Sequence, residues 1–317
     1  MNFPVFDLHC DTALALWKDD FTTCDSLYEN TLHVDLKRAL TLPGYAQCFA
    51  CFTTTSNQHS EELSPEIIFQ KEISAIQDQI KHYSHIIGLA KSANEIISHV
   101  QNGKMSAIMT IEGPAGFGFQ VDKLEELYAL GFRMTTLGWN EDNSLTGSCV
   151  TGGGLTEQGR EYVRKAQQLG MVVDVSHISD AGFWDIIEIT SKPIIASHSN
   201  SRKIWNVPRN LTDEMYLAVC HTGGTVGLNL YSDFLGENPD LDTVCDHVFH
   251  FINISGSDRH VSLGADFDGC SLLPIGVSGV QDYPKLAERL LQRGLTEISV
   301  QNIFWNNALG VIDRCSM

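Results

Sequence analysis

The chain has 317 residues, of which 43% are hydrophobic, and its formal net charge is −18 at pH 7. A chain of this length and apolar content can bury a sizeable core, which excludes global disorder. The negative charge argues against a nucleic-acid partner, whose phosphates would be repelled, and no apolar run approaches the ~18 residues that a membrane span needs.

Short β-type runs alternate with helical patterns along the chain. The runs lie at 3–9, 45–53, 105–111, 132–138, 171–176, 193–197, 224–230 and 260–265. The helical patterns lie at 65–83, 121–130, 156–169, 180–190, 212–221, 240–255 and 296–312. Strands that alternate with helices form a parallel sheet, and eight of them in a chain of this length predict an α/β fold, the (β/α)8 TIM barrel. Since no internal repeat or linker interrupts the pattern, we expect a single catalytic domain over residues 1–317.

Side chains that can bind a metal ion stand at the carboxyl ends of five of these runs. They are His9 and Asp11 in VFDLHCD, Glu112 in SAIMTIEG, His177 in MVVDVSH, His198 in PIIASH and Asp266 in VSLGAD. The carboxyl ends of parallel barrel strands meet at one face, so these side chains are expected to converge on a metal centre.

The first of these segments holds two candidate ligands two residues apart. Because alternate residues of a strand share a face, His9 and Asp11 can bind one ion together while Cys10 points away. A second H-x-D, formed by His33 and Asp35, follows no strand and precedes a helical pattern. We therefore expect Asp35 to cap a helix rather than to bind metal.

Five of the candidates make two three-ligand sites if one of them is shared. A carboxylate can bridge two cations, which suits Glu112, and His177 and His198 end adjacent strands of a sequential sheet. Three protein ligands leave an open position for water, and two zinc ions so held share a hydroxide that can attack an amide or ester carbonyl. Asp266 is then free to relay protons, although a ligand role stays open for it.

The same segments resemble a known family. DLHCDT, TIEGPAG, VDVSH, ASHSNSR, PRNLTDE and GADFDG occur in the order and with the spacing of the membrane (renal) dipeptidase family, peptidase family M19, from about residue 5 to the final WNNALGVI. The resemblance implies a (β/α)8 hydrolase that cleaves dipeptides with two zinc ions per chain. It implies that Arg209 grips the substrate carboxylate and that Asp266 handles protons. The implied ligands are His9 and Asp11 for one zinc, His177 and His198 for the other, and Glu112 between them.

One segment departs from the vertebrate pattern of this family. Where that pattern has a histidine thought to bind substrate and to steady the oxyanion, TTLGWNEDN has Trp139. An indole donates only through its N–H and cannot carry charge. We expect Trp139 and Tyr231 to contribute to substrate binding.

The sequence also bears on the cellular location of the protein and on alternative functions. The first strand begins almost at once, at Val5, and no lipid-anchor tail follows the last helix, so we expect a cytoplasmic protein without a membrane anchor. Nine cysteines without a framework spacing fit a reducing compartment, and a homodimer stays open. Two alternatives to the dipeptidase stay open: a metal hydrolase of another small amide, lactam or ester, and a non-catalytic barrel that binds metal or ligand.

Overall fold

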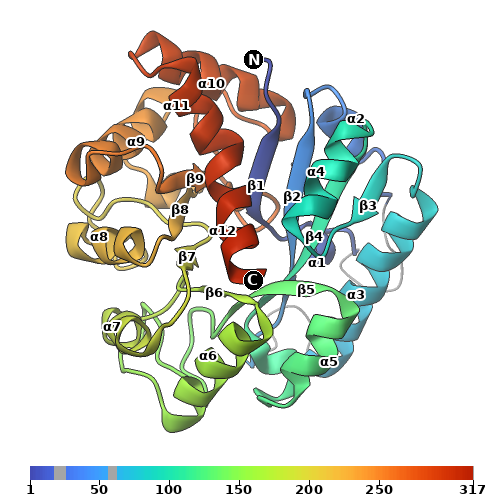
Figure 1. The fold of residues 1–317 in the computed structure, drawn as a ribbon, viewed down its shortest axis with the longest axis vertical. Helices are drawn as coiled ribbons and strands as arrows, with labels where there is room; N and C mark the ends of the chain where they lie inside the picture. The colour runs from blue at the N-terminus through green and yellow to red at the C-terminus, as the bar shows by residue number, and fades with distance from the viewer. Residues whose placement is uncertain (18–25, 56–62, 317) are drawn as a thin grey trace.

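The computed structural model describes residues 1–17, 26–55 and 63–316, and in them a closed parallel barrel (Figure 1). The strands are β1 (Val5–Cys10), β2 (Tyr45–Phe52), β3 (Ile87–Leu89), β4 (Met105–Glu112), β5 (Phe132–Thr136), β6 (Val172–Asp174), β7 (Ile194–Ala196), β8 (Thr225–Leu228) and β9 (Val261–Leu263). Their order is β2-β1-β9-β8-β7-β6-β5-β4, and the pairing of β2 with β4 closes the ring. β3 pairs with the first residues of β4. The predicted (β/α)8 TIM barrel is confirmed.

Helices surround the barrel and connect its strands (Figure 1). They are α1 (Thr12–Ala15), α2 (Leu36–Ala39), α3 (Pro65–His82), α4 (Ala93–Gln101), α5 (Lys123–Leu130), α6 (Glu157–Leu169), α7 (Asp180–Ile189), α8 (Asp213–His221), α9 (Leu241–Ser255), α10 (Tyr283–Gln292), α11 (Glu297–Gln301) and α12 (Asn307–Ser316). A π-helical turn, η4 (Asn302–Asn306), joins α11 to α12. Thr156 and Thr212 cap α6 and α8 by accepting backbone N–H groups. No described helix is long and apolar enough to cross a membrane.

The last helix closes the amino-terminal end of the barrel. Figure 1 shows α12 lying across the ring of strands, with the C-terminus near its centre. Trp305 and Ile312 pack in one cluster with Phe6 of β1, Ile108 of β4 and further residues that point into the barrel. Because this end is filled with apolar side chains, the opposite end, where the strands finish, is left for the polar residues of the site.

Among the strands and α-helices, four were not predicted: α1, β3, α4 and α10. β3 has only three residues, too few for a periodic signal. The predicted helical stretch 296–312 is divided into α11, the π-turn and α12. Six strands, β2 and β5 to β9, end one or two residues earlier than predicted. The chain leaves the β6, β7 and β9 ladders before it reaches His177, His198 and Asp266. Residues 18–25, which fall between α1 and α2 in the chain, lie outside the described residues.

Candidate metal centre and active site

Two strands deliver three of the predicted ligands. His9 lies near the end of β1 and Glu112 is the last residue of β4, while Asp11 follows β1 directly. The β1–β2 register shifts between Asp7 and Cys10, and Cys10 packs in the outer core. His9, Asp11 and Glu112 are all buried. The predicted orientation of this segment, with Cys10 turned away, is confirmed.

The remaining candidates stand in tight turns just past their strands. His177 follows β6 with φ at 67°, and Asp266 follows β9 with φ at 62°. Residues other than glycine rarely adopt this left-handed conformation, which tends to persist where the surrounding structure needs it, often at functional sites. His198 follows β7 and is 1% exposed. The Nε2 atoms of His177 and His198 are 2.9 Å apart, so these two residues are neighbours, as predicted.

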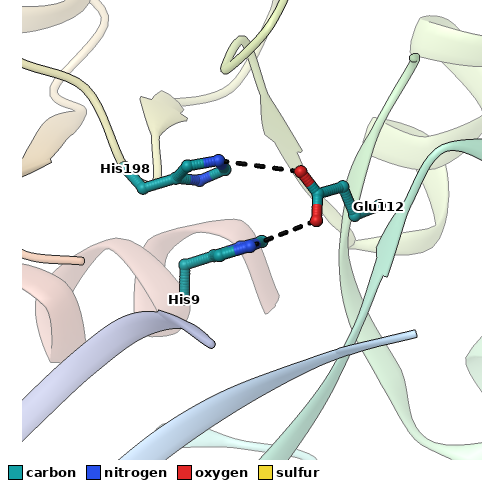
Figure 2. Close-up of side chains that lie close together, drawn as sticks. All are labelled: His9, Glu112 and His198. Atoms are coloured by element: carbon teal, nitrogen blue, oxygen red, sulfur yellow. Dashed lines mark ion pairs between the residues drawn. The ribbon is translucent and has the colours of Figure 1, made fainter. Parts of the chain in front are cut away.

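Glu112 lies at the centre of the group, and its two oxygens face different imidazoles. Its Oε2 is 3.2 Å from His9 Nε2. Its Oε1 is 3.0 Å from His177 Nε2 and 3.7 Å from His198 Nε2. Figure 2 shows Glu112 beside the stacked rings of His9 and His198, whose centroids are 3.8 Å apart, with one carboxylate oxygen facing each ring. One carboxylate thus serves two groups of ligands, the arrangement that a bridging ligand requires.

The polar atoms of the cluster fit bound cations better than they fit one another. Buried His9 Nε2 and Asp11 Oδ1 have no hydrogen-bond partner in the described part of the chain. Buried polar groups without partners are costly, and a metal ion would satisfy them. Gly269 leaves space for an ion beside these carboxylates, since a Cβ at that position would overlap Asp11 Oδ2 and crowd Asp266 Oδ1. Imidazole and carboxylate donors of this kind suit zinc.

The pKa shifts show that the carboxylate side of the cluster is short of positive charge. Burial opposes a charged His9, yet the carboxylates of Glu112 and Asp11 outweigh it and hold the pKa of His9 well above its usual value. Burial and the charge of Glu112 raise the pKa of Asp11. Conversely, burial lowers the pKa of His177 and of His198, which favours neutral imidazoles able to bind metal.

Asp266 lies beside this cluster and has a partner of its own. Its Oδ2 accepts a hydrogen bond of 2.9 Å from Asn229 Nδ2, and its Oδ1 is 3.9 Å from His9 Nε2. His9, Asp11 and Asp266 also form a group that can hold an ion, as do His9, Glu112 and His198. The position therefore suits proton transfer and ligation alike. The second H-x-D behaves as expected, because Asp35 caps α2 by accepting the N–H of Arg38.

Comparisons with known proteins agree with this geometry. The family model described as membrane dipeptidase, peptidase family M19, matches residues 1–316. The chain belongs to this family. A metallo peptidase from Rhodobacter sphaeroides, solved with a phosphinate mimic of the dipeptide L-Ala-D-Ala, is similar with TM-score 0.86 and 26% identity over 99% of this chain and 100% of that one. The dipeptidase AC structure gives TM-score 0.85 and 25% identity over 99% of both chains.

A curated relative is described as an uncharacterized dipeptidase of Schizosaccharomyces pombe. It is 32% identical over 248 residues, which are 76% of this chain and 61% of the yeast protein. Less than two thirds of that relative's length is therefore matched. Membership of family M19 confirms the predicted enzyme class, a metallo-dipeptidase on a TIM barrel, and it implies bound metal ions.

An M19 substrate would enter a cavity of about 210 Å³ above the cluster. The predicted substrate residues Trp139 and Tyr231 both line it, and Trp139 packs edge-on against Phe52 with ring centroids 5.2 Å apart. The other lining residues are Asp11, Leu14, Phe52, Glu112, Asn140, His177, Phe234, Asp266, Asp268 and Gly269. The walls thus combine aromatic rings with carboxylates, a pattern typical of a small-molecule site.

Arg209 is not in the lining of this cavity. It is buried behind His198, donating from Nη1 to Ser199 Oγ at 2.8 Å and from Nη2 to the His198 carbonyl at 2.9 Å. Its guanidinium carbon is 5.7 Å from the ring centre of Phe234, which does line the cavity. The buried Nε has no partner among the described residues. Two of the five N–H groups of the guanidinium thus donate within the protein, and the Nε–H remains without a described partner beside the site.

Two further residues were missed by sequence reasoning. Asn140 Oδ1 lies 2.8 Å from His177 Nδ1, which leaves His177 Nε2 for the cluster. Asn229 holds Asp266 through the hydrogen bond described above. Both are amides in loops, and their partners are 37 positions along the chain. No periodicity or ligand-type signal marks such residues.

Proposed function

We propose that this M19 member is a zinc-dependent dipeptidase that binds two zinc ions per chain and shares Glu112 between them. The observation that carries the proposal is the division of the Glu112 oxygens, one toward His9 at 3.2 Å and the other toward His177 at 3.0 Å. His9 and Asp11 would bind one ion, and His177 and His198 the other. The partnerless His9 Nε2 and Asp11 Oδ1 support this assignment.

The residues around the cluster would have separate roles in proton transfer and in substrate binding. Zinc ions bound there would supply Lewis acidity and lower the pKa of a water molecule. We assign Asp266 to accept the proton of that water and to deliver it to the leaving amine, because its Oδ1 lies beside His9 while Asn229 fixes its Oδ2. Trp139 and Phe52 would shield the reacting peptide from solvent, and Tyr231 would flank it.

The substrate proposed is a dipeptide with a free carboxylate. The cavity of about 210 Å³ is smaller than the roughly 300–1,000 Å³ usual for drug-sized ligands, which favours a substrate of dipeptide size. The partnerless Nε of Arg209 would bind the C-terminal carboxylate in a charge-assisted hydrogen bond. The dipeptide mimic bound by the Rhodobacter sphaeroides relative supports the same class of substrate.

The proposed setting is the reducing cytoplasm, with residues 1–317 as one catalytic domain. All eight cysteines of the described chain are unpaired. Burial raises the pKa of Cys48 and of Cys51, so that neither thiol of the single C-x-x-C is reactive. Light scattering of the purified protein would decide between a monomer and the homodimer left open by the sequence.

The proposal is tested by metal-dependent hydrolysis. The purified protein is assayed with a dipeptide library containing L- and D-residues at the second position, together with N-acetylated dipeptides, a lactam and an aryl ester. We expect dipeptides to be the best substrates, activity to vanish after chelation, and zinc to restore it. Faster hydrolysis of the lactam or ester than of any dipeptide would instead support the rival hydrolase. Bound metal without any turnover would support the non-catalytic barrel.

A further inference from the structure

A chain of buried hydrogen bonds runs from a strand carboxylate to the far nitrogen of His198. Asp174, the last residue of β6, is 1% exposed, and Ser197, which follows β7, is fully buried. The Ser197 hydroxyl donates to Asp174 Oδ2. The same Ser197 Oγ lies 2.7 Å from His198 Nδ1. None of these contacts involves the cavity or a substrate group.

The direction of each proton in this chain is fixed by elementary chemistry. A carboxylate only accepts hydrogen bonds, so Ser197 must give its single hydroxyl proton to Asp174. Ser197 Oγ can then only accept from His198, which requires the proton of the imidazole to be on Nδ1. Nε2 is left with its lone pair, and Nε2 is the atom that lies 2.9 Å from His177 Nε2 and 3.7 Å from Glu112 Oε1.

We infer that Asp174 and Ser197 are positioning residues that hold His198 in the Nδ1–H tautomer and so set the zinc affinity of the site it forms with Glu112 and His177. This inference rests on the proposed ligand role of His198. Groups that bond the outer nitrogen of a ligating histidine fix its tautomer and orientation, and their loss typically weakens metal binding about 10- to 100-fold.

A merely structural role is the competing explanation. Asp174 Oδ1 also accepts the backbone N–H groups of Ser176 at 2.9 Å and of Ser197 at 2.8 Å. In that role Asp174 would only fasten β6 to β7, and its loss would reduce stability without any specific effect on His198. The two explanations predict different results for a substitution that keeps the shape of the side chain and reverses one hydrogen bond.

Asp174→Asn is that substitution. The amide oxygen can keep accepting the two backbone N–H groups, while the amide nitrogen takes the place of Oδ2 and becomes a donor to Ser197 Oγ. The Ser197 hydroxyl would then turn its proton toward His198 Nδ1. His198 would be driven to the Nε2–H tautomer, in which the nitrogen facing the cluster cannot bind metal.

The experiment measures the tautomer and zinc affinity separately. The metal-free protein, labelled with ¹⁵N-histidine, is studied by long-range ¹H–¹⁵N correlation, with His198→Gln used to assign the signal. Zinc affinity is measured by competition with a chromophoric chelator. We expect Nδ1–H in the wild type, Nε2–H in Asp174→Asn, and zinc binding about 10- to 100-fold weaker for one of two ions in Asp174→Asn and in Ser197→Ala. Ser197→Thr, which keeps the hydroxyl, should restore the affinity.

Ser262→Ala is the matched control. Ser262 is a fully buried strand serine whose hydroxyl lies 2.8 Å from Thr225 Oγ1, away from the candidate ligands. The Ser262→Ala variant should lose about as much stability as Asp174→Asn and Ser197→Ala, and it should keep wild-type zinc affinity. Wild-type protein with the proton on Nε2, or Asp174→Asn with zinc affinity within about threefold of wild type, would overturn the inference. If His198→Gln itself binds both ions as tightly as wild type, the proposed ligand set fails instead.

Discussion

Replacing Arg209 by methionine tests how the enzyme recognises its substrate. Arg209 lies behind His198, outside the cavity lining. Two of its five N–H groups donate within the protein, and the buried Nε–H remains without a partner among the described residues. If that remaining donor binds the substrate carboxylate, Arg209→Met removes one charge-assisted hydrogen bond from the transition-state complex. Methionine keeps much of the apolar volume of the side chain, so the packing against Phe234 is largely retained.

The structure limits the size of the effect. A hydrogen bond to a charged group contributes roughly 1.5–3 kcal/mol, and each 1.4 kcal/mol is about tenfold in an equilibrium constant. If the Nε–H alone binds the substrate carboxylate, one such bond is lost in the variant, and kcat/KM should fall by about 10- to 150-fold. The carbonyl of His198 is not left without a partner, since Asn229 Nδ2 lies 3.4 Å from it. Bound zinc should therefore stay close to its wild-type level.

The assay compares a dipeptide with its C-terminal amide in wild-type protein and in the variant. Amidation of the substrate should cost wild-type enzyme the same factor as Arg209→Met, and the two changes together should not multiply. Arg202→Met is the matched control. Arg202 belongs to the same loop, but each of its three nitrogens donates to a described partner, Asp180 or the carbonyls of Pro208 and Asn210.

Two results would refute this account of recognition. One is equal hydrolysis of the dipeptide and its amide by wild-type protein. The other is an Arg209→Met variant that loses the same factor on both substrates, which would make Arg209 a support for His198 and Ser199 rather than a substrate ligand.

Two further predictions concern carboxyl groups. Asp266→Asn should keep its zinc and lose about 10²–10⁴-fold in kcat, because asparagine tolerates the left-handed backbone but cannot carry the proton; metal analysis beside turnover checks this, and wild-type kcat or lost metal would count against the proton relay. Glu72 in α3 is fully buried. Burial raises its pKa well above 4.5, so from pH 4.5 upward the folded state keeps a proton that the unfolded state has lost, and stability falls with rising pH until the folded pKa is passed. Glu72→Gln should remove this decrease in the free energy of unfolding. At pH 8 it should stabilise the protein by about 1.4 kcal/mol for each pH unit by which the folded pKa of Glu72 exceeds the unfolded one. Chemical denaturation at pH 5 and pH 8 measures the effect, and an unchanged pH dependence would show that Glu72 is ionised at little cost.

The barrel was predictable because its strands are buried on both faces and read as apolar runs. Those runs end at residues such as Glu112 and His198, whose polarity contrasts sharply with the strand before them. The same contrast indicated the site, since parallel strands finish at one face. The short β3 could not be predicted, because three residues are too few to show a periodic pattern. The helical pattern of α10, with Tyr283, Leu286 and Leu290 buried on one face, was present in the sequence and was missed.

What the sequence could not provide is the arrangement around the ligands. Asn140 and Asn229 reach their partners across loops, and Asp174 resembles any polar residue at the end of a strand. The family resemblance implied that Arg209 grips the substrate carboxylate, but its place behind His198 depends on how the loop 201–211 folds back, with Ser201 bridged to Leu211. Hydrogen bonds between residues distant in the chain leave no local signal, so these contacts appear only in the folded structure.

Metal stoichiometry tests the central claim most directly. Zinc per chain is measured by elemental analysis in wild-type protein, Glu112→Ala and His177→Ala after identical dialysis. Glu112 faces His9 with one oxygen and His177 with the other. We therefore expect two equivalents of zinc in wild-type protein, loss of both in Glu112→Ala, and loss of only one in His177→Ala. A Glu112→Ala variant that keeps one full equivalent with wild-type affinity would contradict the shared carboxylate.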